Sequence, residues 1–394
     1  MILKITFWVL LAIIAYTYLG YTLVLFIANL FIRPRRKKTA IPETGEELPD
    51  ISLIIPAYNE MNVIDRKIKN INSLEYPANK IDVIWLTDGS DDGSYEYLKE
   101  KTNHKVLHQT QRLGKSQAVN KAMKEVSTDL AILTDANTIL NTESLNHIVA
   151  EFSDSKTGCV SGEKRIMPAL TGNAVCAGEG IYWRYESFIK KLESDLNTAI
   201  GGAGELLGLR SNLFREIPAD IINDDFYISV MIIKQGYRIS YCPGAFALEK
   251  PSLNTKEEKK RKVRIASGGM QIFIRHPDLL NIFKYGFYSF QYFSHKVLRW
   301  TIVPALFFAI PVINLLIIVN NGIGNDWYSA ILFIQALFFL LAILGAFIRS
   351  SSISFKTLFL PYYLTLMNIS NLKGAWQYIR GNYDTKWEKS DRMI

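Results

Sequence analysis

The chain has 394 residues, of which 49% are hydrophobic, and a formal net charge of +8. This length accommodates one catalytic domain of about 200 to 250 residues together with further material. The positive charge does not indicate a nucleic-acid-binding protein, because much of it lies beside apolar segments and no basic stripe with interleaved aromatic residues accompanies it. Cys159, Cys176 and Cys242 are widely spaced and form no Cys-x-x-Cys pair, so we expect reduced cytoplasmic thiols.

The first predicted element is a transmembrane anchor with a basic flank at residues 1–38. Residues 5–32 carry no charged side chain, and about 20 such residues are enough for a helix to cross a bilayer. The run ends in a basic cluster rather than at a small-residue cleavage site, which argues against a cleaved signal peptide. Lys and Arg beside a span tend to stay on the cytoplasmic side, so we expect the next domain to be cytoplasmic. Residues 39–50 are a polar linker.

Alternating strands and helices are predicted from residue 51 onward. Apolar runs of strand length occur at 51–55, 81–86 and 130–133, and the segments between them have helical spacing of apolar residues. This alternation is typical of βαβ units around a buried, mostly parallel sheet, and we assign residues 51–275 to one cytoplasmic α/β domain.

Polar and acidic residues follow all three apolar runs, in the stretches PAYNE, TDGSDDGS and TDANT. In any one of these loops, the polar residues could instead serve only to form the turn into the next helix. Because ligands bind at the carboxyl ends of the strands in open α/β sheets, three such loops on one edge favour a shared site.

The carboxy-terminal part is predicted to return to the membrane. Residues 276–300 are rich in aromatic side chains and end in basic residues beside an apolar run, which is typical of an amphipathic interfacial helix. Residues 301–350 contain two long uncharged runs and form a predicted transmembrane hairpin. Residues 351–394 hold a third apolar segment and a basic cytoplasmic tail. If residues 354–370 spanned the membrane, the basic tail would lie on the non-cytoplasmic side. Because basic residues tend to stay on the cytoplasmic side, we expect an interfacial or re-entrant segment instead.

Two common phosphate-binding motifs are not satisfied. The GKS stretch at 114–116 would need glycine in place of Gln109 to form a Walker A loop. The GAGELLG stretch at 202–208 has Leu207 where the dinucleotide fingerprint needs its third glycine. A nucleoside triphosphatase and a dehydrogenase are therefore unsupported.

Seven stretches in chain order resemble the family 2 glycosyltransferases with the GT-A fold. They are IIPAYNE, LTDGSDDGS, GKSQAVNKA, LTDANT, GGAGELLGLRSNLF, NDDFYISVMIIKQGYRISYCPGAFALEK and KRKVRIASGG. The chain is most similar to membrane-bound members related to cellulose, chitin and hyaluronan synthases. The resemblance implies a GT-A domain with a mostly parallel central sheet between N- and C-terminal transmembrane helices. It also implies inverting transfer of a sugar from a nucleotide-diphosphate sugar, of the UDP type, to a membrane-associated glycan or lipid-linked acceptor.

The resemblance assigns a donor site. Pro56, Tyr58 and Glu60 would line the nucleotide pocket, and Asp88 would accept a hydrogen bond from the imino N–H of a uracil-type base, which suits an acceptor-only carboxylate. Lys115 lies at a predicted helix start, where an ammonium and backbone N–H groups can both bind a diphosphate.

Two arginines complete the predicted donor site. Arg264 would contact the leaving diphosphate, and Arg261 belongs to the same segment. Processive relatives hold a tryptophan at the next position, where this chain has Ile265. An aliphatic side chain lacks the flat π-face on which a sugar ring stacks, so long-chain processivity is in doubt.

The resemblance also assigns a metal site and a base. Asp135 would bind Mg²⁺ or Mn²⁺, and the amide oxygen of Asn137 is a weaker ligand for the same ions. We therefore expect metal to bind weakly until the donor phosphates complete the site. Asp225 falls at the position of the catalytic base, with Asp224 as its neighbour. A carboxylate within hydrogen-bond reach can remove the proton of the attacking acceptor hydroxyl.

Two other functions remain open at this point. One is transfer of a sugar to polyprenyl phosphate, and the other is a glycan export or scaffold membrane protein without catalysis. Asp135 and Asp225 are both present, which favours catalysis, and the clear spans contain no ionisable residue, which disfavours coupled transport. We expect an integral protein of a bacterial inner membrane whose partners are a nucleotide sugar, the acceptor and membrane lipids, and we assign no oligomeric state.

Overall fold

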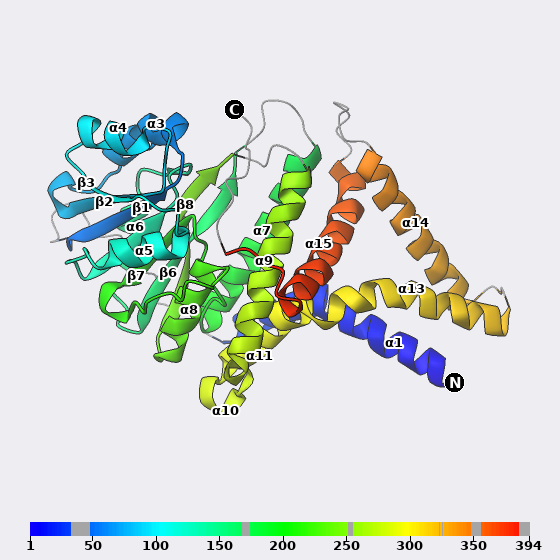
Figure 1. The fold of residues 1–394 in the computed structure, drawn as a ribbon. Helices are drawn as coiled ribbons and strands as arrows, with labels where there is room; N and C mark the ends of the chain where they lie inside the picture. The colour runs from blue at the N-terminus through cyan, green and yellow to red at the C-terminus, as the bar shows by residue number, and fades with distance from the viewer. Residues whose placement is uncertain are drawn as a thin grey trace.

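One mixed sheet lies at the centre of the protein. The computed structural model describes residues 1–32, 48–167, 174–250, 255–322, 324, 326–347 and 356–385. Within these residues eight strands pair in the order β3-β2-β1-β4-β7-β6-β8-β5 (Figure 1). The strands are β1 (Ile51–Ala57), β2 (Ile81–Asp88), β3 (Lys105–Gln109), β4 (Leu130–Thr134), β5 (Ile139–Leu140), β6 (Thr157–Ile166), β7 (Leu206–Arg210) and β8 (Arg238–Glu249).

The four strands β3, β2, β1 and β4 are parallel neighbours, and β6 is parallel to β8. Strand β7 runs antiparallel to both of its neighbours, β4 and β6, and β5 runs antiparallel to β8. All seven residues of β1 are buried, as expected of a central parallel strand covered on both faces. The α/β fold expected from the sequence is therefore confirmed, with a sheet that is parallel at one end and mixed at the other.

Helices cover both faces of the sheet because successive residues of a strand point to opposite sides. On β1, Ile54 packs on one face with residues of α5 and α8, whereas Leu53 and Ile55 pack on the other face with residues of α3, α4 and α6. These helices are α3 (Met61–Asn72), α4 (Ser94–Lys101), α5 (Lys115–Met123), α6 (Ser144–Glu151) and α8 (Asp224–Lys234). This arrangement leaves the carboxyl ends of β1, β2 and β4 open at one edge.

Three long helices stand between the sheet and the apolar helices of the chain (Figure 1). They are α7 (Ala174–Leu196), α9 (Thr255–Arg275) and α15 (Lys356–Ile379). Helix α15 packs along α9 and also contacts α7. The sheet domain is thus joined to the apolar helices through a layer of helices rather than through a single linker.

Three helices in the described part of the chain are long and apolar enough to cross a membrane. The first is Ile2–Phe31, which comprises α1 (Ile2–Ala15), a π-helical turn and α2 (Tyr21–Phe31). The second is α13 (Ile302–Asn321). The third is Trp327–Ala346, which lies within α14 (Trp327–Phe347). The Trp8 indole N–H donates to the hydroxyl of Tyr328 at 3.1 Å, so the beginning of α1 lies beside the beginning of α14. The three predicted spans are present as helices, whereas α15, which holds the third apolar segment, does not belong to this group.

Residues 276–300 form a series of short helical segments rather than one amphipathic helix. The segments are Pro277–Leu280, α10 (Ile282–Tyr285), α11 (Phe287–Tyr292), Phe293–Val297 and α12 (Leu298–Trp300). Gly286 interrupts them with a φ of +57°. The rings of Tyr288 and Tyr292 are buried in the core beside the sheet and stack 6.0 Å apart, so part of the aromatic content serves packing. An interfacial location for this region stays a prediction.

Several predicted segments lie outside the described residues. These are the basic flank at 33–38, most of the linker at 39–50, the end of the hairpin region with the start of the following segment at 348–355, and the end of the basic tail at 386–394.

The contact between α9 and α15 depends on Gly374. An added Cβ at this position would lie 2.6 Å from the Cβ of Ala266 and 2.6 Å from the carbonyl oxygen of Val263. Overpacking costs about 1–3 kcal/mol, which exceeds the ~1 kcal/mol that alanine gains over glycine in a helix. We predict that Gly374→Ala lowers the Tm of the detergent-solubilised chain. The exposed neighbour variant Lys373→Ala is the control, and an equal Tm for the two variants would contradict the close contact.

Candidate functional site

A pocket of about 330 Å³ opens at the carboxyl ends of β1, β2 and β4. The lining residues come from the ends of these strands and from the start of α5. They are Pro56, Ala57, Tyr58, Asp88, Arg112, Gly114, Lys115, Ala118 and Asp135. The structure therefore brings together five of the predicted donor-binding residues in one pocket.

Asp88 holds the turn that begins α5. Its carboxylate accepts hydrogen bonds from the backbone N–H of Leu113 at 2.8 Å and of Gly114 at 2.7 Å, and from the side chain of Gln109 at 3.0 Å. Gly114 has a φ of +95°, a conformation that a residue with a Cβ adopts only with strain. Asp88 thus lies in the pocket wall, as the sequence predicts, and it also orients the N-terminus of the helix that carries Lys115.

Tyr58 and Arg112 form the outer wall of the pocket. The guanidinium of Arg112 lies 3.9 Å from the centre of the Tyr58 ring, which is a cation–π contact. Arg112 was not singled out from the sequence, although it lies three residues before Lys115 in the same loop. The pocket therefore contains two basic side chains, and both suit an anionic ligand.

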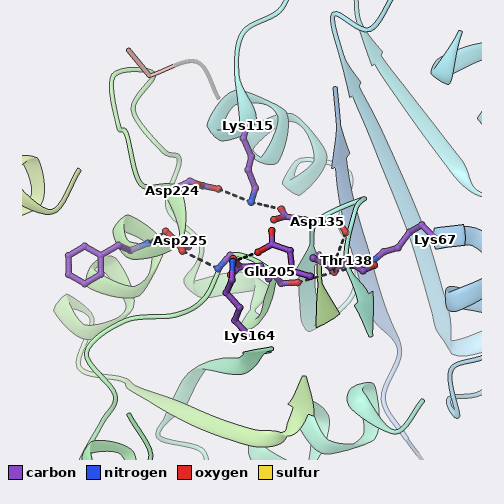
Figure 2. Close-up of polar contacts among 12 residues, drawn as sticks. Lys67, Lys115, Asp135, Thr138, Lys164, Glu205, Asp224 and Asp225 are labelled. Atoms are coloured by element: carbon purple, nitrogen blue, oxygen red, sulfur yellow. Dashed lines mark hydrogen bonds and ion pairs between the residues drawn. The ribbon is translucent and has the colours of Figure 1, made fainter. Parts of the chain in front are cut away.

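The ammonium of Lys115 lies between two carboxylates (Figure 2). It donates to Asp135 at 2.6 Å and lies 3.9 Å from Asp224. Burial alone would lower the pKa of Lys115, but the charges of Asp135 and Asp224 outweigh burial and raise it above its ordinary value. Lys115 is therefore a fixed positive charge, and it links the end of β4 to the start of α8.

Asp225 occupies the first turn of α8 beside this cluster. One carboxylate oxygen accepts from the backbone N–H of Phe226 at 2.7 Å, and the other accepts from that of Gly204 at 3.0 Å. Burial raises the pKa of Asp225 to about 6, and the charge of Asp224 adds to this rise while Lys115 opposes it. A carboxyl group with this pKa is largely ionised at neutral pH and can accept a proton, as a general base must.

Asp135 and Asn137 carry oxygen atoms of the kinds that a divalent cation binds. The amide oxygen of Asn137 is buried and has no hydrogen-bond partner among the described residues, as expected of an oxygen kept for a ligand. The described residues contain no cluster of three His, Cys, Asp or Glu that could hold a metal. The chain thus offers one carboxylate and one amide, and further oxygen ligands would have to come from the bound substrate.

Other predicted residues lie outside this pocket. Glu60 is a buried residue at the start of α3. Arg261 forms an ion pair with Glu205 at 3.2 Å, and Arg264 donates to the carbonyl of Ile222 at 2.9 Å. Burial lowers the pKa of Arg264, while the charges of Asp224 and Asp225 oppose this, so its guanidinium lies near the acidic pair.

A buried ionic cluster that the sequence did not reveal lies next to Asp225. Lys164 of β6 contacts both Glu205 and Glu249, and Arg261 joins the same two carboxylates. Figure 2 shows Glu205 between Asp135 and Asp225. Burial alone would raise the pKa of Glu205, but Lys164 and Arg261 lower it. The only signal in the sequence is an acidic residue after the glycines of GGAGE.

The loop that carries Asp135 rests on a second buried lysine, Lys67 of α3. Its ammonium donates to the hydroxyl of Thr134 at 3.0 Å and to the carbonyl of Thr138 at 3.1 Å. Burial lowers the pKa of Lys67 to about 7, and the nearby charge of Asp135 opposes this. The ammonium connects the residues on either side of Asp135 and thereby supports the loop.

Parts of the chain are similar to known proteins. Residues 52–210 match the family model "Glycosyl transferase family 2". A poly-beta-1,6-N-acetyl-D-glucosamine synthase of Staphylococcus aureus (strain MSSA476) is 26% identical over 242 residues, which cover 58% of this chain and 57% of that protein. The synthase of the same name from Staphylococcus epidermidis is 26% identical over 270 residues, which cover 65% of this chain and 63% of that protein. The match therefore spans less than two thirds of either relative.

A solved structure shares the fold. The mannosyltransferase PcManGT from Pyrobaculum calidifontis, in complex with GDP-Man and Mn²⁺, superposes with a TM-score of 0.68 at 20% sequence identity. The superposition covers 96% of this chain and 99% of that chain, so it extends beyond the sheet domain to the surrounding helices. The fold class that the sequence motifs indicated is confirmed, and residues 52–210 match the model of the family that these motifs resemble.

The ion pair between Lys115 and Asp135 predicts weak metal binding by the protein alone. An ammonium held at 2.6 Å competes with a cation for the same carboxylate. We predict that Lys115→Met binds Mn²⁺ about tenfold or more tightly than the unmodified chain in titrations without nucleotide, the size of one lost charge-assisted contact. Lys121→Met on the same helix is the control. Equal Mn²⁺ affinity in the two variants would contradict this competition.

Proposed function

We propose that the chain is an inverting glycosyltransferase of polysaccharide or glycoconjugate biosynthesis, a proposal supported by the match of residues 52–210 to the model "Glycosyl transferase family 2". It takes a sugar from a nucleoside-diphosphate sugar of the UDP type and transfers it to a membrane-associated glycan or lipid-linked acceptor. The observation that carries the proposal is the convergence of Lys115, Asp135 and Asp225 at one edge of the sheet. These residues provide a phosphate-binding cation, a metal ligand and a base in one place.

The pocket at the ends of β1, β2 and β4 accommodates the donor nucleotide. Tyr58 and Asp88 line it for the base and ribose, and Arg112 and Lys115 supply positive charge for the diphosphate. The N-terminus of α5 adds backbone N–H groups and the positive end of the helix dipole on the same side. Asp135 and Asn137 would hold a Mg²⁺ or Mn²⁺ ion, which supplies Lewis-acid stabilisation of the charge on the leaving diphosphate.

Asp225 acts as the base of a single displacement. A hydroxyl oxygen of the acceptor forms a bond to the anomeric carbon from the face opposite the diphosphate, and the bond from that carbon to the phosphate oxygen breaks. The nucleoside diphosphate leaves with the electron pair, and the hydroxyl proton passes to the Asp225 carboxylate. The hydrogen bond from Gly204 holds this carboxylate in place, and Asp224 stays directed at Lys115.

The apolar helices support a membrane location for this reaction. Three segments are long enough to span, and the contact of Trp8 with Tyr328 agrees with a topology in which both lie on the outer side. With the basic flank after the first span on the inner side, the catalytic domain is cytoplasmic. The similarity to synthases that build a sugar polymer supports a glycan acceptor over polyprenyl phosphate.

The most direct test is a screen of the purified full-length chain against nucleotide sugars. We expect release of nucleoside diphosphate from one donor class when Mn²⁺ or Mg²⁺ is present and loss of release when a chelator is added. Product analysis by mass spectrometry would then identify the elongated acceptor. If no nucleotide sugar is turned over with either ion in a lipid environment, the proposed function is wrong.

The role of Asp225 predicts a specific pH profile. A base must be unprotonated, so with a pKa of about 6 the value of kcat/KM falls as the pH drops through about 6 and is constant above it. Asp225→Asn should reduce transfer by about 10²-fold or more without loss of donor binding. Asp220→Asn is the matched control, since Asp220 pairs with Arg275 at the surface. Full activity of Asp225→Asn would refute this assignment.

A further inference from the structure

Helix α3 carries a buried lysine that forms no ion pair. The side chain of Lys67 is fully buried, and no carboxylate among the described residues lies within ion-pair distance of its ammonium. Burial lowers its pKa to about 7 and the charge of Asp135 opposes this, but the ion pair of Asp135 is with Lys115 instead. Burying an ammonium without a paired carboxylate costs free energy, so packing alone does not explain a lysine at this position.

Three uncharged oxygen atoms surround the ammonium of Lys67 (Figure 2). It lies 3.0 Å from the hydroxyl of Thr134, 3.1 Å from the carbonyl oxygen of Thr138 and 3.3 Å from the hydroxyl of Thr138. An ammonium has three protons to donate and no lone pair that could accept. Both threonine hydroxyls therefore accept from Lys67 and donate their own protons elsewhere.

The two hydroxyls donate to two backbone carbonyls at the site. The hydroxyl of Thr138 donates to the carbonyl of Asp135 at 2.8 Å, and that of Thr134 donates to the carbonyl of Glu205 at 3.0 Å. The two hydroxyl oxygens lie only 3.2 Å apart, which is close enough for a bond between them. Because each oxygen accepts from the ammonium, both protons are directed away from it. Lys67 thus sets the direction of both hydrogen bonds.

The bond from Thr134 to Glu205 joins the loops that carry the reacting groups. Thr134 is the last residue of β4, and the next residue is the candidate metal ligand Asp135. On the other side, Glu205 follows Gly204, whose N–H donates to Asp225 at 3.0 Å. The backbone beside the metal ligand is therefore held against the backbone that holds the base.

Two neighbours of Lys67 on α3 hold the rest of the same loop. The guanidinium of Arg66 donates to the carbonyl of Asn137 at 3.2 Å, and the side-chain amide of Asn70 exchanges two hydrogen bonds of 2.8 Å with the backbone of Leu140. Residues three apart on a helix lie on one face, so Lys67 and Asn70 face the loop together. The side-chain oxygen of Asn137 has no partner in the described part of the chain. The helix thus holds the backbone of the loop and leaves this oxygen for a ligand.

We propose that Lys67 is a positioning residue, whose ammonium holds the loop that carries Asp135 in its metal-binding conformation and ties this loop to Glu205. The inference rests on the proposed function for the roles of Asp135 as metal ligand and Asp225 as base. The diphosphate leaves from one side of the anomeric carbon and the acceptor attacks from the other, so these two carboxylates need a fixed separation. A misplacement of about 1 Å can reduce the rate about 10²-fold.

The test measures the Mn²⁺ affinity of the full-length chain in lipid nanodiscs with uridine diphosphate present. A pH of about 6 lies below the pKa of Lys67 and keeps its ammonium charged. We expect Lys67→Met to weaken Mn²⁺ binding about tenfold, the size of one charge-assisted hydrogen bond. Uridine diphosphate without metal should bind as before, because Lys67 does not line the nucleotide pocket. Lys69→Met is the matched control, since Lys69 lies on the same helix and is exposed.

A second variant retains the charge and removes the hydroxyls. The double variant Thr134→Val/Thr138→Val should also weaken Mn²⁺ binding, because the ammonium then has no hydroxyls to direct. Adding Lys67→Met to it should cost less than the sum of the two separate effects, as expected of groups that act together. If Lys67→Met does not fold, the double variant decides alone, and unchanged Mn²⁺ affinity in it overturns the proposal.

The sign of the effect separates positioning from simple electrostatics. Removing a positive charge near a cation site would by itself tighten Mn²⁺ binding, so tighter binding in Lys67→Met overturns the proposal. Equal affinity in Lys67→Met and Lys69→Met, or additive effects with the threonine variant, overturns it too. If the unmodified chain binds no Mn²⁺ with uridine diphosphate, both the metal site and its positioning are refuted. Normal Mn²⁺ binding without sugar transfer would refute the transferase function alone.

Discussion

The Lys115 ammonium lies 2.6 Å from Asp135 and 3.9 Å from Asp224, at a point where the carboxyl groups of Asp225 and Glu205 also converge. Carboxylates crowded in a buried place repel one another and resist ionisation. Burial is the main cause of the raised pKa of Asp225; the charge of Asp224 adds to the rise, and Lys115 offsets part of it. The Lys115 ammonium is therefore needed to keep several of these neighbouring carboxyl groups ionised at the same time. The ammonium that offsets the charges of the protein's own carboxylates can also form an ion pair with a diphosphate when a substrate binds.

The order of the strands places this charged centre where the parallel and the mixed parts of the sheet meet. Strand β7 enters the sheet between β4 and β6, and the loop before it reaches Asp225 through the N–H of Gly204. A Cβ at Gly204 would lie 3.3 Å from both the Asp225 carboxylate and the Lys115 ammonium, so a larger residue would require these side chains to shift. The antiparallel insertion of β7 thus separates the parallel half of the sheet from the half that faces α7.

Buried polar contacts also tie the sheet domain to the first apolar helix. The two ring nitrogens of His295 lie 2.7 Å from Glu193 and 3.0 Å from Glu186, both on α7. The hydroxyl of Tyr21 on α2 donates to Glu193 at 2.7 Å. Because removing one partner leaves an uncompensated buried charge, such contacts hold the helices in one arrangement. Glu186 also pairs with Lys296 and Arg299, so the same network includes the segment before α13.

The strands β1, β2 and β4 could be predicted because each is a continuous apolar run that ends in polar residues. The edge strand β3 and the strands β6, β7 and β8 mix polar and apolar residues, and periodicity alone does not distinguish them from loops or helices. For the same reason Lys67 and Lys164 look like solvated charges in the sequence, whereas the structure buries both side chains. Arg261 was assigned to the donor site from its segment, and its ion pairs with Glu205 and Glu249 are visible only in the fold.

The sequence by itself determined the apolar helices, the α/β class and the acidic residues at the strand ends, because these depend on local runs of residues. The tertiary structure decided which side chains share a site. Lys115 meets Asp224 across more than one hundred residues of chain, and Lys190 faces Tyr241 only because α7 packs on β6 and β8. Such contacts depend on strand order and helix packing, and local sequence patterns predict neither.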